Sequence, residues 1–138
     1  MGDPILDAAR AVQAKAYAPY SHFKVGAALE AEDGRIFVGC NVENAAYGVT
    51  FCAERAALAA GVAAGAREFR RVVIVSDAEP PAAPCGACRQ ALAEFSPGLR
   101  VEAFGLTGSR RWTLDALLPD AFGAELRPPR SDVQDGMA

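Results

Sequence analysis

Histidine and clusters of basic residues are scarce in this chain. Its 138 residues include one histidine, His22, and 14 lysines and arginines against 17 aspartates and glutamates, for a net charge of −3. Proteins that bind nucleic acid carry a basic patch or stripe, so this composition argues against a nucleic-acid partner. His22 stands in a polar Tyr-Ser-His-Phe-Lys run and is expected at the surface or in a loop, so we do not assign it as a metal ligand.

Long apolar segments are also missing. No stretch approaches the length that spans a membrane, and the acidic start Met1-Gly2-Asp3-Pro4 lacks the apolar region of a signal peptide. We therefore expect no membrane partner and a cytoplasmic location. With 51% hydrophobic residues, the chain suits one domain with its own core. We predict this domain over residues 1–126 and an irregular, Pro-rich tail over 127–138.

The four cysteines are the most informative residues that are present. Cys52 opens the run Cys-Ala-Glu-Arg, and Cys85 and Cys88 stand with two residues between them in Pro-Cys-Gly-Ala-Cys. In a cytoplasmic chain, such spacing is more typical of a metal or catalytic site than of disulfides. Both groups fall at predicted helix N-termini, where the helix dipole favours the metal-binding thiolate. The pattern predicts that Cys52, Cys85 and Cys88 hold one zinc ion.

The number of ligands separates two kinds of zinc site. Three protein ligands plus a water are typical of a catalytic zinc, and four protein ligands of a structural one. Glu54 follows Cys52 by two residues on the first turn of a helix, so it is expected beside an open metal position. A structural site that also uses Cys40 is the alternative, although Cys40 lies in a predicted strand with no second cysteine nearby.

Three thiolates would leave negative charge at the metal and weaken it as a Lewis acid. A metal-bound water needs a pKa near ~7 to react at neutral pH, so some group should withdraw charge from the sulfurs. Arg55 is the nearest candidate, and Arg89 is a weaker one. The other interpretation of Arg55 is a solvated charge on the helix surface.

Hydrophobic periodicity and turn residues predict the order of the elements. A helix that starts at Asp3-Pro4 and ends at Pro19 is followed by a hairpin over 25–42, a helix from about Cys52 to Gly65, a strand over 71–75, a helix from about Cys85, a strand over 99–106 and a short helix over 113–118. Strands that alternate with helices predict an α/β protein with helix layers around a sheet.

Longer runs surround these motifs. They are Tyr17-Ala18-Pro19-Tyr20-Ser21-His22-Phe23-Lys24-Val25-Gly26-Ala27-Ala28-Leu29, Gly39-Cys40-Asn41-Val42-Glu43-Asn44-Ala45-Ala46-Tyr47, Cys52-Ala53-Glu54-Arg55, Pro84-Cys85-Gly86-Ala87-Cys88-Arg89-Gln90 and Leu117-Leu118-Pro119-Asp120-Ala121-Phe122. Together they resemble the small, three-cysteine, homotetrameric class of cytidine deaminases. The chain departs from many relatives at Ala83 and Ala56, neither of which is a proposed ligand.

This resemblance implies a fold, a cofactor and a reaction. The fold would be a three-layer α/β/α sandwich with a mixed, roughly five-stranded sheet, with one Zn²⁺ in each subunit. The reaction would be hydrolytic deamination of cytidine and deoxycytidine to uridine and deoxyuridine, as in pyrimidine salvage. Glu54 would be base first and acid afterwards. The backbone N–H of Ala53 and the carbonyl of Ala83 would contact the base edge, and Phe23 would stack on the pyrimidine.

The resemblance also implies a sugar site and an assembly. Asn41 and Glu43 would hold the ribose through its 3′-hydroxyl, and Tyr47 and Phe122 would lie near sites shared between subunits of a homotetramer. Alternate residues of an extended segment point the same way, which suits a joint role for Asn41 and Glu43. The plainer interpretation is a loop whose polar side chains satisfy its own backbone.

Three rival functions stay open at this point. The protein could deaminate another nucleoside or an aminopyrimidine-like small molecule with the same chemistry. It could be a zinc-stabilised binding module that uses Cys40 as a fourth ligand. An editor of polynucleotides is the poorest of the three, because the chain lacks a basic face.

Overall fold

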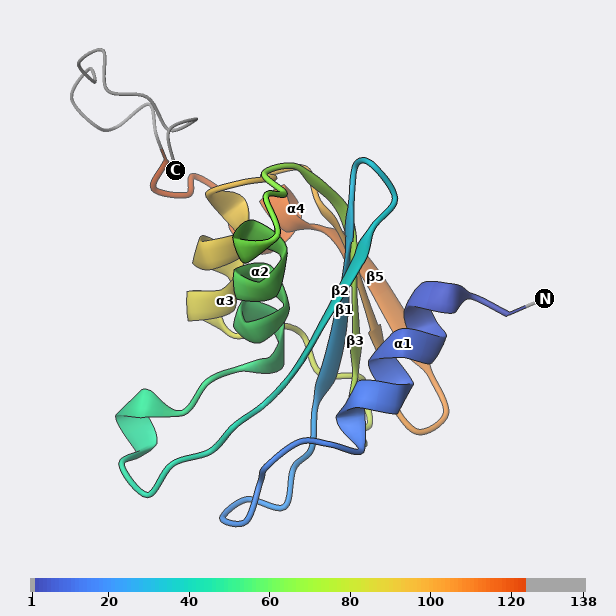
Figure 1. Cartoon of the computed structure of the whole chain (residues 1–138), viewed down its shortest axis with the longest axis vertical. Coiled ribbons are helices and arrows are strands. Elements are labelled where there is room, and N and C mark those ends of the chain that lie inside the picture. Colours follow the sequence, from blue (N-terminus) through green and yellow to red (C-terminus); the bar gives the residue numbers. More distant parts are fainter. Residues whose placement is uncertain (1, 124–138) are drawn as a thin grey trace.

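A mixed sheet of five strands runs through the middle of the protein (Figure 1). The computed structural model describes residues 2–123. In chain order, the elements are α1 (Pro4–Gln13), β1 (Gly26–Ala31), β2 (Ile36–Cys40), the 3₁₀ turn η1 (Tyr47–Val49), α2 (Ala53–Ala63), β3 (Phe69–Val75), α3 (Gly86–Ala93), β4 (Arg100–Phe104), β5 (Ser109–Thr113) and α4 (Leu114–Leu117). The boundary predicted at residue 126 and the tail over 127–138 lie outside the described residues.

The strand order is β2-β1-β3-β4-β5. Among the five strands found in residues 2–123, only β3 and β4 pair in parallel, and α3 makes the crossover between them. The other neighbours are antiparallel, with Gly26 opposite Cys40 in one register and Phe104 opposite Ser109 in another. The sheet is therefore mixed, and the carboxyl ends of β3 and β4 lie side by side at one end of the strands. This is the end of the sheet at which α/β proteins place their ligands.

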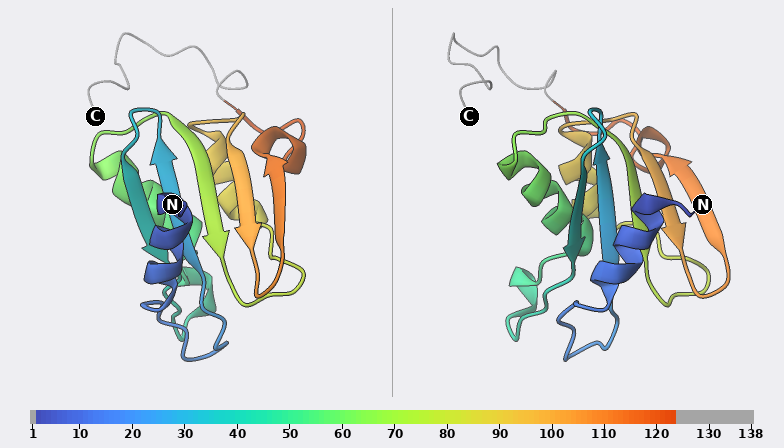
Figure 2. Two further views of the ribbon diagram at one scale, coloured as in Figure 1. Left: turned by 90° about the vertical axis from the view of Figure 1, so that its right-hand side faces the viewer. Right: turned by 45° about the vertical axis from the view of Figure 1, so that its right-hand side comes forward.

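Helices cover both faces of the sheet, which confirms the predicted three-layer α/β/α sandwich. Figures 1 and 2 show α1 on one face and α2 with α3 on the other. The larger core fills the second side, because alternate residues of β1, β3 and β4, such as Leu29, Val72 and Val101, point toward α2 and α3. Ala28, Val73 and Val75 pack on the opposite side against Ile5 and Ala9 of α1.

Helix α1 begins where predicted and ends earlier than predicted. Asp3 caps it by accepting a hydrogen bond from the Ile5 N–H at 3.1 Å, and Pro4 is its first residue. The helix ends at Gln13 rather than at Pro19, so that prediction was wrong. The reason is tertiary: the backbone of Tyr17 is drawn into a bridge with Val42, and a helix could not continue through it.

Strand β5 was not located from the sequence. Its residues, Ser-Arg-Arg-Trp-Thr, lack the apolar alternation that marks a half-buried strand, because β5 is the edge of the sheet beside β4. Arg110 stacks on Trp112 with 4.6 Å between the guanidinium carbon and the ring centre. Edge strands rich in charge resist pairing with other chains, which explains a strand of this composition.

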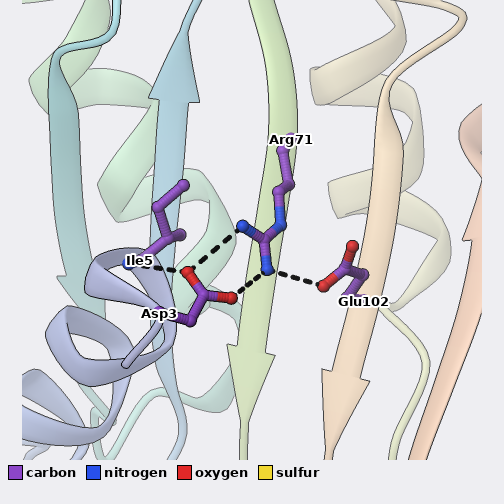
Figure 3. A network of polar contacts seen from close by, with 4 residues as sticks. All are labelled: Asp3, Ile5, Arg71 and Glu102. Carbon is purple, nitrogen blue, oxygen red and sulfur yellow. Dashed lines mark hydrogen bonds and ion pairs between the residues drawn. The ribbon is translucent and has the colours of Figure 1, made fainter. Parts of the chain in front are cut away.

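A half-buried ion network joins the start of α1 to the sheet (Figure 3). The Arg71 guanidinium donates from Nη2 to Glu102 Oε1 at 2.8 Å and from Nη1 to Asp3 Oδ1 at 3.2 Å, and Nη2 also pairs with the second Asp3 oxygen. The Arg71 side chain is 15% exposed and that of Glu102 is 8% exposed. Arg71 is thus the counter-charge of two carboxylates, and it holds the pKa of Asp3 below its ordinary value.

Replacing Arg71 with methionine is expected to lower the free energy of unfolding by about 3 kcal/mol, because Glu102 is left charged and buried without its partner. Urea denaturation followed by circular dichroism measures the loss. The double variant R71M/E102M is the control and should be more stable than the single variant, since no unpaired carboxylate is buried. If R71M loses less than about 0.5 kcal/mol, a value typical of surface substitutions, the network has no such role.

The helices of the described residues include none that is long and apolar enough to cross a membrane.

Candidate metal centre and active site

Three cysteine sulfurs converge at the starts of two neighbouring helices. Cys52 is the N-cap of α2, and Cys85 is the N-cap of α3, with Cys88 in its first turn. Sγ of Cys85 lies 3.9 Å from Sγ of Cys52 and 3.4 Å from Sγ of Cys88, and all three sulfurs lie within 4.8 Å of one another. The structure therefore brings together the three residues that the spacing singled out, although Cys85 follows Cys52 at a long distance in the sequence.

This donor set fits a zinc ion. Two sulfurs at 2.3 Å from one tetrahedral zinc are about 3.8 Å apart, close to the two separations seen here. Cys40 ends β2 and does not belong to the group of metal-binding side chains found among residues 2–123. The described residues thus offer three sulfur ligands, as in a catalytic site with an open position, and this geometry gives no support to a four-thiolate structural site.

The surroundings of Cys52 favour its thiolate. The pKa of Cys52 falls to about 5, chiefly because the Cys88 thiol donates to its sulfur, with a further contribution from Arg55. Arg55 Nη2 lies 3.5 Å from Cys52 Sγ. The backbone N–H of Cys88 donates to Cys85 Sγ at 3.5 Å, so the first turn of α3 also supports negative charge on sulfur. Thiolate is the form that binds metal.

Arg55 approaches a cysteine sulfur, whereas Arg89 binds backbone carbonyls. The Arg55 guanidinium reaches the Cys52 sulfur and also lies over the Phe51 ring, 5.3 Å from its centre. Arg89 instead donates to two backbone carbonyls, Pro84 O at 2.7 Å and Leu117 O at 2.9 Å. The prediction that Arg89 is a weaker candidate for withdrawing charge from the sulfurs was therefore wrong. Arg89 ties the chain before Cys85 to the end of α4.

Glu54 is a buried carboxyl beside the sulfurs. It lies in the first turn of α2, is 6% exposed, and follows Cys52 by two residues. Burial raises the pKa of Glu54 to about 7, and the negative charge of Cys52 adds to the effect. A group that must accept and then donate a proton works best with a pKa near the pH of reaction. The position and the pKa both suit a general base that later acts as an acid.

Gly39 is a residue that the sequence reasoning did not assign to the site. A Cβ at this position would lie 2.4 Å from the backbone N of Ala57 and 2.5 Å from the carbonyl O of Ala53. Only glycine lets β2 pass so close to the first turn of α2, which carries Glu54. A glycine inside a strand is the sequence signal for such a close approach.

Asn41 and Glu43 hold the loop that precedes β1. Asn41 is buried; its Oδ1 accepts from the Val25 N–H at 2.9 Å and its Nδ2 donates to Phe23 O at 2.8 Å. Glu43 accepts from the backbone N–H groups of Tyr20, at 2.9 Å, and Ser21, at 3.1 Å, and from the Ser21 hydroxyl. These contacts lower the pKa of Glu43, with the Ser21 hydroxyl as the main cause. Both side chains thus satisfy the loop's backbone, as the plainer interpretation held, and both keep unused hydrogen-bonding capacity.

The aromatic residues implied at the site are exposed in this single chain. Phe23 is 39% exposed, Tyr47 75% and Phe122 61%. The Tyr47 ring meets Tyr20 edge-on beside a hollow of about 430 Å³ that also involves Ser21, Glu43 and Thr50. The backbone carbonyl of Phe122 accepts a hydrogen bond from Gln90 Nε2 at 2.8 Å, which ties the C-terminal segment to α3.

The comparison with protein families decides the identity of this site. Residues 3–101 match the family model described as the cytidine and deoxycytidylate deaminase zinc-binding region. This span holds the three clustered cysteines and Glu54. The chain belongs to the cytidine and deoxycytidylate deaminase family.

Relatives of this deaminase include proteins from several bacteria. The cytidine deaminase of Sporosarcina psychrophila is 46% identical over 125 residues, which cover 89% of this chain and 92% of that protein. That of Halalkalibacterium halodurans is 47% identical over 119 residues, 83% of this chain and 90% of that protein. The crystal structure of cytidine deaminase from Burkholderia pseudomallei matches with a TM-score of 0.84 and 50% identity, covering 88% of this chain and 100% of that one.

Family membership and geometry agree on the cofactor. The family model describes a zinc-binding region, and the three sulfurs of this deaminase have the spacing of zinc ligands. The protein is therefore a zinc enzyme of the deaminase family.

Proposed function

We propose that this deaminase hydrolyses cytidine and deoxycytidine to uridine and deoxyuridine with release of ammonia, as a step of pyrimidine salvage. The observation that carries the proposal is the buried Glu54 carboxyl, with a pKa of about 7, beside three sulfurs that fit one zinc ion. Relatives named cytidine deaminase, 46% and 47% identical over most of the chain, support the choice of substrate.

Glu54 would move the protons of this reaction. Zinc held by Cys52, Cys85 and Cys88 would lower the pKa of a water molecule at its open position toward neutrality. Glu54 would take a proton from the attacking water and deliver it to N3 of the pyrimidine while the water oxygen bonds to C4. It would then carry the proton of the new C4 hydroxyl to the 4-amino group, so that the C4–N bond breaks, ammonia leaves and a C4 carbonyl remains. One carboxyl can serve both steps because its pKa lies near neutral pH.

Backbone groups would hold the base in place. Ala53 is the first residue of α2, so its N–H has no partner within the helix and is free to donate to the pyrimidine edge. The carbonyl of Ala83, just before Pro84 and Cys85, would accept from the 4-amino group. Phe23, half-exposed in the loop that Asn41 holds, would stack on the ring.

The sugar would be recognised by the side chains that already order this loop. A carboxylate offers about four acceptor positions, and Glu43 uses three of them within the protein. The remaining one suits the 3′-hydroxyl as a donor, while Asn41 keeps one N–H and one lone pair for the same group. Because these contacts concern the 3′ position, cytidine and deoxycytidine are both expected substrates.

The assembly is proposed to be a homotetramer with shared active sites. Tyr47 and Phe122 are both more than half-exposed in the single chain, which leaves them free to contact neighbouring subunits. Cytoplasmic location is part of the same proposal, because cysteines that bind metal rather than form disulfides are typical of a reducing compartment.

The loss of the ultraviolet band of cytidine tests the reaction. Purified, zinc-loaded protein should remove the band steadily, with ammonia appearing in equal amount, and deoxycytidine should behave in the same way. Cytosine, adenosine and single-stranded DNA form the comparison panel. A flat trace with cytidine from folded, zinc-loaded protein would reject this substrate, and turnover of another member of the panel would then identify a different deaminase.

A further inference from the structure

The loop that joins β3 to α3 delivers two groups on which the reaction depends. Residues 76–85 lead from the end of β3 to Cys85, and the carbonyl of Ala83 lies within this segment. Three of its residues are prolines, which restrict its backbone. The position of Ala83 and Cys85 is therefore sensitive to where the first half of the loop is anchored.

Glu79 anchors this loop to the turn between β4 and β5. Glu79 Oε1 accepts from the N–H of Thr107 at 2.9 Å and from that of Gly108 at 3.4 Å, and Oε2 accepts from the Thr107 hydroxyl at 3.2 Å. Figure 2 shows the loop after β3 and the β4–β5 turn at the same edge of the sheet. The Thr107 N–H is the main reason why the pKa of Glu79 lies below its ordinary value, so the carboxyl is charged at neutral pH.

The turn is shaped to receive this carboxylate. A Cβ on Gly105 would lie 2.3 Å from Glu79 Oε1 and 2.2 Å from the carbonyl O of Ala78. A side chain at position 105 would thus displace both the carboxylate and the loop backbone. The turn closes on itself through a hydrogen bond from the Gly105 N–H to Gly108 O at 2.9 Å, which fixes the donors that face Glu79. The missing side chain at Gly105 leaves room for the Glu79 carboxylate, and two backbone N–H groups and the Thr107 hydroxyl donate to it.

We propose that Glu79 is a positioning residue of this deaminase, which clamps the β3–α3 loop to the β4–β5 turn and so fixes the Ala83 carbonyl and Cys85. The part that concerns Ala83 rests on the proposed function, and the part that concerns Cys85 rests only on the zinc site. Without the clamp, the segment before Cys85 is freer to move. Release of zinc would then be faster. The substrate base would be bound more weakly, both in the ground state and in the transition state.

The test compares Glu79→Ala with two matched variants. Glu79→Gln keeps the size and one acceptor oxygen for the Thr107 N–H, and Glu32→Ala removes an exposed carboxylate at the opposite edge of the sheet, after β1. The first readout is the rate at which zinc passes from the loaded protein to a coloured chelator. We expect E79A to release zinc up to about tenfold faster than the wild type. Loss of groups that support metal ligands typically costs about 10- to 100-fold, so this is the lower end of that range. E79Q and E32A should release zinc at nearly the wild-type rate.

The second readout is the split between KM and kcat for cytidine. E79A should raise KM with little change in kcat, the pattern expected when a contact is lost from the bound substrate and the transition state alike. A folded E79A protein with the zinc release and KM of E79Q overturns the proposal.

If the wild-type protein leaves cytidine unchanged, the proposed function fails, while zinc release still decides whether the clamp exists. Should E79A not fold, Thr107→Val removes the hydroxyl alone, and zinc release at the wild-type rate in that variant counts against the clamp.

Discussion

Replacing Glu54 with glutamine is expected to lower kcat for cytidine by about 10²- to 10⁴-fold, the contribution typical of general acid–base catalysis. Glutamine has the size of glutamate and cannot take up or release the proton. Glu54 lies next to the three cysteine sulfurs but does not belong to the metal-binding cluster that they form. The variant should therefore keep its zinc. Steady-state kinetics and metal analysis of the same preparation measure both quantities. Glu68→Gln, an exposed site near the start of β3, is the matched control and should leave kcat unchanged.

The same substitution also has an expected effect on stability. The pKa of Glu54 is raised from 4.5 to about 7 by burial, so the folded state prefers the protonated carboxyl. This preference stabilises the zinc-free protein fully below pH 4.5 and is lost as the pH rises toward 7. At pH 8, zinc-free E54Q should therefore be more stable than zinc-free wild type, by as much as about 3 kcal/mol. Near-normal turnover in E54Q would remove Glu54 from the mechanism, whatever its stability.

Replacing Cys88 with serine is expected to weaken zinc binding by more than about 100-fold, since even changes to groups that merely support ligands cost 10- to 100-fold. Cys88 is fully buried and its sulfur lies 3.4 Å from that of Cys85, so no other thiol among residues 2–123 can take its place in the cluster. Competition with a chelator of known affinity measures the binding. Turnover of cytidine should disappear together with the metal.

Cys40→Ser is the matched control for this loss. Cys40 ends β2 and lies outside the cluster of three sulfurs, so the variant should keep both zinc and activity. X-ray absorption of the loaded wild-type protein should show three sulfurs on the metal. A fourth sulfur that disappears in the Cys40 variant would instead establish the structural, four-thiolate site and leave no open position for chemistry.

Predictions from the sequence were most successful where the local signal was strong. Asp3-Pro4 marked the start of α1, and Asp33-Gly34 marked the hairpin, where Gly34 has a φ of 93°. Gly65 ends α2 with a φ of 97°. The start of α3 was predicted at Cys85, and the helix begins at Gly86 with Cys85 as its cap. At Pro4, Gly34 and Gly65, a residue type with a special backbone preference determines the local geometry.

Predictions failed where distant segments decide the local structure. The end of α1 depends on the bridge between Tyr17 and Val42, which periodicity cannot show. Strand β5 exists because β4 offers it an edge, although its own residues carry no strand pattern. Arg89 was placed near the sulfurs because it follows Cys88, but its long side chain reaches the carbonyls of Pro84 and Leu117. The position of a long side chain in the sequence does not show which atoms its charged group contacts.

By itself, the sequence determined the chemical type of the site: cysteines at two helix starts and an acid two residues after the first of them. Those features are local, because helix caps and short spacings act over one turn. Only the tertiary structure decided that three sulfurs meet while Cys40 stays apart, since the strand order brings the starts of α2 and α3 to one edge of the sheet. It also decided the raised pKa of Glu54 and the hold of Glu79 on the turn after β4. Burial and contacts between distant loops create both properties, and they arise only when the whole chain has packed.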